Sequence, residues 1–216
     1  MGFILKEAKG KKFTIRFKLF TLIIIILLVY IFHRQILEGL GSFLIEQEYQ
    51  IKNADVILFE EENLLKNSVE KCNLLYQENN CKEVWIIRLP MKQNIIPEEK
   101  INKLLKEILD SLGYKFNYRY FFFNLEHPYT YNKSSVIVDS LKKYGYNKVL
   151  ILTNAFHSKR TLSVYRKLLL PYGINVFCSV YYTDYNSSDW WNSAEGVRNI
   201  VSEYLKLVYY WLKGYL

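Results

Sequence analysis

An uncharged run of fourteen residues near the N-terminus, residues 19–32 (LFTLIIIILLVYIF), constrains this chain more than any other feature. As a helix the run rises about 21 Å, short of the roughly 30 Å hydrocarbon core of a bilayer. Apolar neighbours at 13–17 and at 36–40 lengthen it, while Arg16 and Lys18 can reach the headgroups. We therefore expect a transmembrane anchor over residues 19–34, followed by a juxtamembrane helix over 35–49.

Two other interpretations of this run stay open. A cleaved signal peptide needs small residues at a cleavage site, and only Gly39 and Gly41 approach that pattern. A buried core helix should alternate apolar and polar faces, whereas residues 22–26 are apolar all round. The pattern favours a retained anchor.

The net charge of +8 is concentrated at the N-terminus. Residues 1–18 hold six basic residues and one acidic residue, a net charge of +5, which leaves +3 for the rest of the chain. A basic terminal block is not the distributed basic face of a duplex-binding domain, so we expect no nucleic-acid partner. The same block predicts that residues 1–18 are cytoplasmic and that the body lies outside the cytoplasmic membrane.

The three cysteines, Cys72, Cys81 and Cys178, are an odd number without zinc-binding spacing. A Cys72–Cys81 bridge is one alternative, but three buried thiols are favoured, and no metal is expected.

From residue 50 onward, apolar runs of strand length alternate with segments of helical periodicity. Strands are predicted at 54–59, 83–88, 118–123, 148–153 and 174–180, and helices at 64–76, 97–113, 134–144, 157–169 and 193–213. Strands that are apolar on both faces indicate a parallel sheet covered by helices on both sides. We expect one α/β domain over residues 50–216, a three-layer α/β/α structure with a mostly parallel five-stranded sheet.

Ligands of such sheets bind at the carboxyl ends of the strands, here the loops that begin at residues 60, 89, 124, 154 and 181. One candidate site is the segment 153–161 (TNAFHSKRT), where a strand runs into a helix. His157 would lie near the first helical turn, where free N–H groups attract anions, and Arg160 could bind a phosphate or carboxylate. Alternatively, Ser158 or Asn154 caps the helix and the two basic side chains are solvated.

A second candidate is the polar segment 126–133 (EHPYTYNK), which carries His127, Thr130 and Asn132. The alternative is a turn built on Pro128 with polar neighbours. The three glutamates at 60–62 could bind a cation, but they also suit a helix start, which is the favoured interpretation.

From about Ala54 onward the chain resembles the SanA/ElyC/YdcF family of bacterial proteins. The resemblance rests on ADVILF, on Thr130-Tyr-Asn132, on KVLILTNAFHSKRTLSVYRK and on DWWNSAEGVRNIVSEYLKLVYYWLKG. It implies a Rossmann-like domain behind a membrane anchor and a role in envelope biogenesis, in peptidoglycan or lipid-carrier metabolism. His157 and Arg160 match the family's His-x-x-Arg element, and Thr130 matches its Thr-x-Glu-like element.

Three positions depart from the family pattern. Residues 59–62 (FEEE) replace a glycine-rich turn, Arg88-Leu89-Pro90 replaces a Ser-Gly-Gly-like turn, and Asn132 stands where an acid is expected. These departures leave open a non-catalytic binding or scaffold protein that has lost the family's active-site glycines and acid.

The resulting hypothesis is that a lipid-linked or phosphorylated small molecule binds at the sheet edge. His157 and His127 are the candidate catalytic residues, and the candidate ligand-binding residues are Arg160, Thr130, Asn132, Thr153 and Asn154. The sequence does not identify a cofactor, although it contains no G-x-G-x-x-G element for a dinucleotide.

The last predicted helix is apolar nearly all round over residues 205–213, with Tyr and Trp near its end. Such aromatic residues favour a membrane interface. Packing on the sheet, or against residues 36–45, would explain the same composition.

Overall fold

The computed structural model describes residues 15–48, 51–60, 66–88, 98–114, 116–123 and 127–216. Its centre is a five-stranded sheet in the order β3-β2-β1-β4-β5, and every neighbouring pair of strands is parallel. The strands are β1 (Val56–Glu60), β2 (Glu83–Arg88), β3 (Tyr118–Phe122), β4 (Lys148–Asn154) and β5 (Asn175–Tyr181). The predicted α/β class is confirmed.

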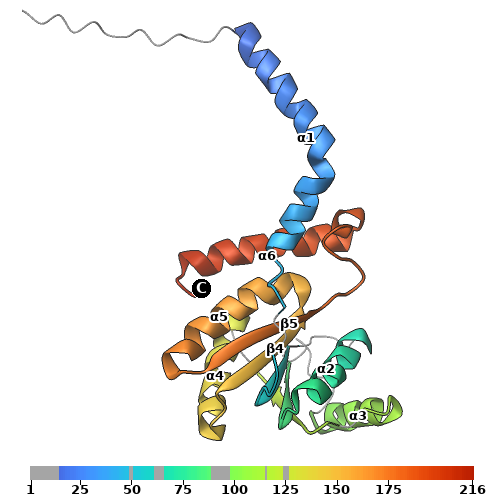
Figure 1. Cartoon of the computed structure of the whole chain (residues 1–216), viewed down its shortest axis with the longest axis vertical. Helices are drawn as coiled ribbons and strands as arrows, with labels where there is room; N and C mark the ends of the chain where they lie inside the picture. The colour runs from blue at the N-terminus through green and yellow to red at the C-terminus, as the bar shows by residue number, and fades with distance from the viewer. Residues whose placement is uncertain (1–14, 49–50, 61–65, 89–97, 115, 124–126) are drawn as a thin grey trace, which may run out of the picture.

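Helices cover both faces of the sheet (Figure 1). α2 (Lys66–Asn79) and α3 (Glu98–Ser111) pack on one face, and α4 (Tyr129–Tyr144) and α5 (Ser158–Leu169) pack on the other. β1 is buried throughout: Val56 and Leu58 join the core under α4 and α5, and Ile57 and Phe59 join the core under α2 and α3. This two-sided burial explains why the strand is a continuous apolar run.

The starts of α4 and α5 differ from the prediction in ways that move candidate site residues. α4 begins at Tyr129 rather than at residue 134, after Pro128 in an extended N-cap conformation, so Thr130 and Asn132 lie in its first turn and not in a loop. α5 is preceded by a short 3-10 turn, Ala155–His157, and His157 is the last residue of that turn.

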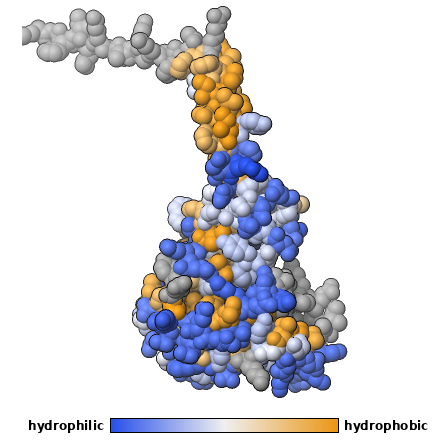
Figure 2. All heavy atoms as spheres, turned by 45° about the vertical axis from the view of Figure 1, so that its right-hand side comes forward, coloured by the Kyte–Doolittle hydropathy of each residue, from blue (hydrophilic) through white to orange (hydrophobic). Residues whose placement is uncertain are grey.

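The N-terminal helix α1 (Ile15–Phe43) projects away from the domain (Figure 1). From Phe17 to Phe43 it is long and apolar enough to cross a membrane, and none of its most apolar window is buried. Figure 2 shows apolar atoms along its shaft. This exposure disagrees with the core-helix alternative. Residues 35–43, expected in a separate juxtamembrane helix, continue α1 without a break, and 44–48 follow as turn and irregular chain.

The C-terminal end of α1 packs against α6 (Ala194–Leu212) and the 3-10 turn Trp190–Asn192 that precedes α6. Trp190 Nε1 donates to the Leu37 carbonyl at 3.0 Å, and Tyr204 Oη donates to the Leu40 carbonyl at 2.7 Å. Leu44 is fully buried in the same cluster. These contacts attach α1 firmly to the domain.

The cysteines are three free, buried thiols, as the usual burial of cysteine predicts.

Candidate functional site

A cavity of about 380 Å³ opens at the carboxyl edge of the sheet. Strand ends form part of its wall: Glu60 from β1, Thr153 and Asn154 from β4, and Tyr181 from β5. β1 and β4 are neighbours at the point where the strand order reverses, the usual ligand position in open parallel sheets. The cavity therefore lies at the edge that the sequence indicates.

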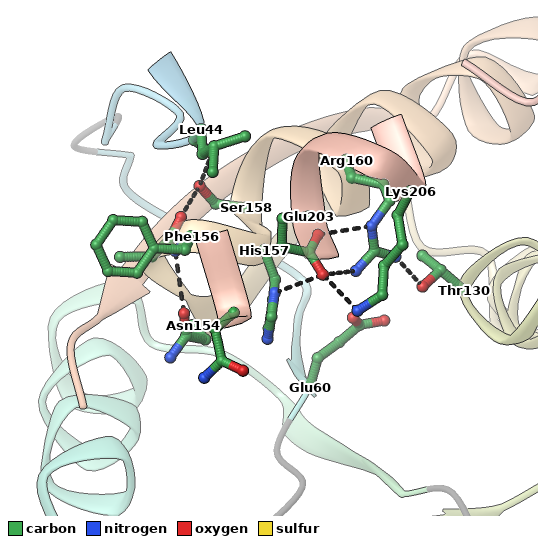
Figure 3. A network of polar contacts seen from close by, with 12 residues as sticks. Leu44, Glu60, Thr130, Asn154, Phe156, His157, Ser158, Arg160, Glu203 and Lys206 are labelled. Atoms are coloured by element: carbon green, nitrogen blue, oxygen red, sulfur yellow. Dashed lines mark hydrogen bonds and ion pairs between the residues drawn. The ribbon is translucent and has the colours of Figure 1, made fainter. Parts of the chain in front are cut away.

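Glu203 of α6 is the centre of a polar network beside this cavity (Figure 3). Arg160 donates to both of its carboxylate oxygens, from Nε at 2.8 Å and from Nη2 at 3.0 Å. Lys206 Nζ donates to Oε1 at 2.7 Å, and His157 Nδ1 lies 3.1 Å from the same oxygen. Arg160 Nη1 donates to Thr130 Oγ1. One carboxylate thus connects α6 to α5 and, through Arg160, to α4.

The network keeps Glu203 ionised. Burial by itself would raise the pKa of this carboxyl, but His157 and Arg160 outweigh burial and hold the pKa well below the ordinary 4.5. For Arg160, burial would lower the pKa of the guanidinium, and Glu203 reverses this and raises it. Arg160 and Glu203 therefore form a buried ion pair, and all three guanidinium nitrogens already have partners.

His157 has an arrangement suited to proton transfer. Its Nδ1 side faces Glu203, while the second ring nitrogen points away from that carboxylate (Figure 3). The side chain is 31% exposed and lines the cavity. A carboxylate on one imidazole nitrogen orients the ring and leaves the other nitrogen to exchange a proton with a ligand.

A second buried pair also lines the cavity. Lys133 Nζ of α4 is 3.0 Å from Glu60 Oε2, and Tyr165 Oη of α5 donates to Glu60 Oε1 at 2.8 Å. Burial and the nearby Glu60 charge raise the pKa of Tyr165 well above its ordinary value, so its hydroxyl stays a hydrogen-bond donor. Glu60 thus joins β1 to two helices and does not lie in a helix start. Glu61 and Glu62 lie outside the described residues.

A second cavity of about 350 Å³ adjoins the first. The two share four lining residues, Thr130, Lys133, Arg160 and Lys206. The remaining lining residues of the second cavity are mostly rings, contributed by His127, Pro128, Tyr129, Tyr209 and Tyr210. One cavity is therefore lined mainly by polar groups and its neighbour mainly by rings, with the cationic side chains between them.

The candidate residues from the sequence separate into three groups. Thr130, Thr153, Asn154, His157 and Arg160 all line the first cavity. His127 lines the second cavity, where its ring centroid lies 3.9 Å from that of Tyr129. The two candidate histidines therefore line different cavities. Asn132 is not among the described residues that line either one.

The start of α5 is bound by the chain itself. The backbone N–H of Lys159 donates to the Leu44 carbonyl at 3.2 Å, and Ser158 Oγ accepts from the backbone N–H of Glu46 at 2.8 Å. Asn154 Oδ1 accepts from the Phe156 N–H, in agreement with the capping alternative. Because the segment after α1 binds groups at this helix end, a ligand anion in the cavity would be contacted by side chains. The basic ones are His157, Lys133, which is paired with Glu60, and Lys206, which is paired with Glu203.

Sequence reasoning missed Glu203, Lys206, Lys133 and the role of Glu60. The sequence does contain a pattern that indicates Glu203. This residue lies three positions after Ile200 and four before Leu207, on the apolar side of a helix. A charge on such a side is nearly always paired. Its partner Arg160 lies 43 positions earlier, and only the fold brings the two together.

Within the described ranges, no group of three or more His, Cys, Asp or Glu residues is arranged to hold a metal ion.

No protein-family model and no curated protein matches the chain. Among solved structures it is similar to the N-terminal domain of trehalose-6-phosphate phosphatase from Candida albicans, with 12% identity and a TM-score of 0.33. The match covers 74% of this chain and 40% of that one. Similarity at this level supports no inference about function.

Proposed function

We propose that this chain is a membrane-anchored bacterial envelope protein of the SanA/ElyC/YdcF type, acting in peptidoglycan or lipid-carrier metabolism. α1 is its single anchor in the cytoplasmic membrane, the N-terminus is inside, and the α/β domain is outside. The domain binds a phosphate-bearing ligand at the carboxyl edge of the sheet.

The observation that carries this proposal is the first cavity and its lining. Its volume of about 380 Å³ suits a small ligand. Lys133, Lys206 and His157 supply N–H donors to a phosphate, and the last of these has a nitrogen available for proton transfer. The adjoining ring-lined cavity could accept an apolar part of the same ligand, as a lipid-linked phosphate would require.

Phosphate binding is tested on the full chain in detergent, with inorganic phosphate and pyrophosphate as probes in calorimetric titrations. We expect Lys206→Ala and Lys133→Ala each to weaken binding by about tenfold or more, the scale of a lost charge-assisted hydrogen bond. Lys143→Ala is the matched control, since Lys143 lies exposed near the end of α4 and outside both cavities. Equal affinities in all three variants and the parent would contradict the proposal.

A second candidate function, a binding protein without catalysis, is favoured by the state of Arg160. Its positive charge is already paired with Glu203, and its Nη1 donates to Thr130, so less of that charge is available to stabilise charge that develops in a reaction. His157→Gln distinguishes the two functions because it removes proton transfer and keeps a polar side chain.

The readouts for His157→Gln are phosphate affinity and rescue of an envelope defect in a strain that lacks the protein. Loss of rescue with binding retained supports an enzyme. Full rescue excludes a catalytic role for His157 and supports the binding protein.

A further inference from the structure

One face of α6 is an exposed apolar stripe. Its members follow helical spacing and are between 40% and 70% exposed: Val197, Val201, Leu205, Val208 and Leu212. Residues spaced in this way lie along one side of a helix. Contiguous exposed apolar surface of this kind marks a contact with a membrane or another protein.

The stripe points away from the domain. The opposite side of α6 holds its buried residues, Gly196, Ile200, Glu203 and Tyr210, which face the rest of the α/β domain. The part of the domain that the structure describes therefore leaves the stripe uncovered.

The side of α6 next to the stripe holds the base of α1. Tyr204 donates to the Leu40 carbonyl, and its ring stacks on Phe43 with the centroids 6.0 Å apart. Figure 1 shows α6 lying crosswise beneath α1, between that helix and the sheet. If α1 crosses a bilayer, α6, which lies crosswise at the base of α1, is oriented along the plane of the membrane.

The depth of α6 also fits the membrane interface. The apolar run of α1 ends at His33 and Arg34, and Leu40 lies six residues further, about 9 Å along the helix axis. The headgroup layer on each side of a bilayer is about 5–8 Å thick. The Leu40 contact therefore lies at the outer limit of the headgroup layer, and the stripe side chains of α6 would have to reach back into that layer.

The flanks of the stripe have the residue types that interfaces favour. Trp211 is 70% exposed and Tyr209 is 43% exposed. Arg198 and Lys213 are exposed as well, near the start and just after the end of α6. Aromatic rings favour the headgroup level, and basic side chains favour lipid phosphates.

We propose that α6 is an interfacial helix, which lays this stripe against the headgroup layer of the same bilayer that α1 crosses. The domain is then held at the membrane by two elements and in one orientation. This inference requires α1 to be embedded, and it is independent of any ligand in the cavities.

The test places an environment-sensitive fluorophore at Val201→Cys in the full chain, reconstituted in nanodiscs with and without nitroxide-labelled lipids. The native thiols are buried, so labelling is directed to the new cysteine. Val136→Cys is the matched control, because Val136 is a similarly exposed valine, at 45%, on α4. Leu205→Cys repeats the measurement at a second stripe position.

We expect a blue-shifted emission and strong nitroxide quenching at positions 201 and 205, and neither effect at position 136. Quenching at 201 and 205 no greater than at 136 would overturn the proposal. A blue shift without nitroxide quenching, appearing only with more than one protein per disc, would also overturn it and identify a second copy as the occupant.

Discussion

Glu203 is 1% exposed, and its oxygens face Arg160, Lys206 and His157. Glu203→Gln keeps the shape of the side chain and removes its charge, so the buried guanidinium of Arg160 loses its counterion. Removing one partner of a buried ion pair lowers the free energy of unfolding by about 3–5 kcal/mol. We expect the free energy of unfolding to fall by about 3 kcal/mol, measured by urea unfolding of the full chain in detergent.

Two comparisons control that measurement. Glu195→Gln changes an exposed glutamate in the first turn of the same helix and should leave stability within about 0.5 kcal/mol of the parent. The double variant Arg160→Met/Glu203→Leu removes both charges and should recover part of the loss. If the double variant were less stable than the sum of the single variants Arg160→Met and Glu203→Leu predicts, the pair would not be the source of the effect.

Tyr165 tests the second buried pair. Tyr165→Phe removes only the hydroxyl that donates to Glu60, so the buried Oε1 of that carboxylate loses this hydrogen-bond donor. A buried acceptor without its donor costs about 1–3 kcal/mol, and we expect a loss of that size in urea unfolding. Tyr172→Phe is the matched control, since Tyr172 is 54% exposed and should change stability little. Equal effects of the two substitutions would show that the Glu60 contact contributes nothing.

At the scale of elements, α1 requires a glycine at position 41, because Trp190 approaches the helix closely there. A Cβ there would lie 2.8 Å from Nε1 of Trp190, the buried donor to the Leu37 carbonyl, and 3.2 Å from the Ser187 carbonyl oxygen. Gly41→Ala should therefore displace α1 from Trp190 and lower stability by about 1–3 kcal/mol, as overpacking usually does. Tryptophan fluorescence and urea unfolding measure both effects.

The same helix supplies the control. A Cβ at Gly39 would meet nothing within 4 Å, so Gly39→Ala should raise stability by about 0.5–1 kcal/mol through helix propensity. Identical results at 39 and 41 would mean that α1 does not pack on Trp190.

The elements also show how far the sequence could predict this protein. Each strand was located to within two residues of its observed bounds, because burial on both faces requires a run of apolar residues whatever the neighbours are. The start of α4 was missed because residues 129–133 (YTYNK) carry no apolar periodicity. This first turn is held by the tertiary contact of Thr130 with Arg160 and by the bond from Ser134 Oγ to the Thr130 carbonyl within the helix.

The site was predictable where its residues follow the carboxyl ends of strands, as Thr130, Thr153, His157 and Arg160 do. The strand end and helix start at 153–160 are adjacent in the sequence, so Thr153, His157 and Arg160 could be placed at one edge. Glu203 comes from a helix with no sequence link to that edge, and its pairing with Arg160 depends on how α6 packs on α5. The same pairing changes what Arg160 can do, since it binds a protein carboxylate.

At the scale of the whole molecule, several carboxylates couple stability to pH. Burial alone would raise their pKa values, but hydrogen bonds and charges outweigh it at Asp55, Glu48 and Glu83 as well as at Glu203. Asp55 accepts from the N–H groups of Asn147 and Lys148 and so joins the start of β1 to the start of β4. Protonation of these groups weakens connections across the domain.

The sign of the effect follows from the lowered pKa values. A carboxyl whose pKa is lower in the folded state contributes stability that is complete above its unfolded pKa and is lost as the pH falls toward its folded pKa. The ordinary values are 4.5 for Glu203 and 3.8 for Asp55, so stability should be level near neutral pH and should decline below about pH 4.5. Thermal unfolding of the full chain in detergent, followed from pH 7 to pH 3, measures this decline.

Substitution separates the contribution of Glu203 from the general effect of acid. Glu203→Gln has no group to protonate there, so its melting temperature should fall less than that of the parent between pH 7 and pH 3, although it starts lower. Glu107→Gln, an exposed position on α3, removes the same charge and should keep the slope of the parent. Parallel slopes for parent and Glu203→Gln would mean that this carboxylate is not held ionised by its neighbours, and that the network linking α4, α5 and α6 is not what acid disrupts.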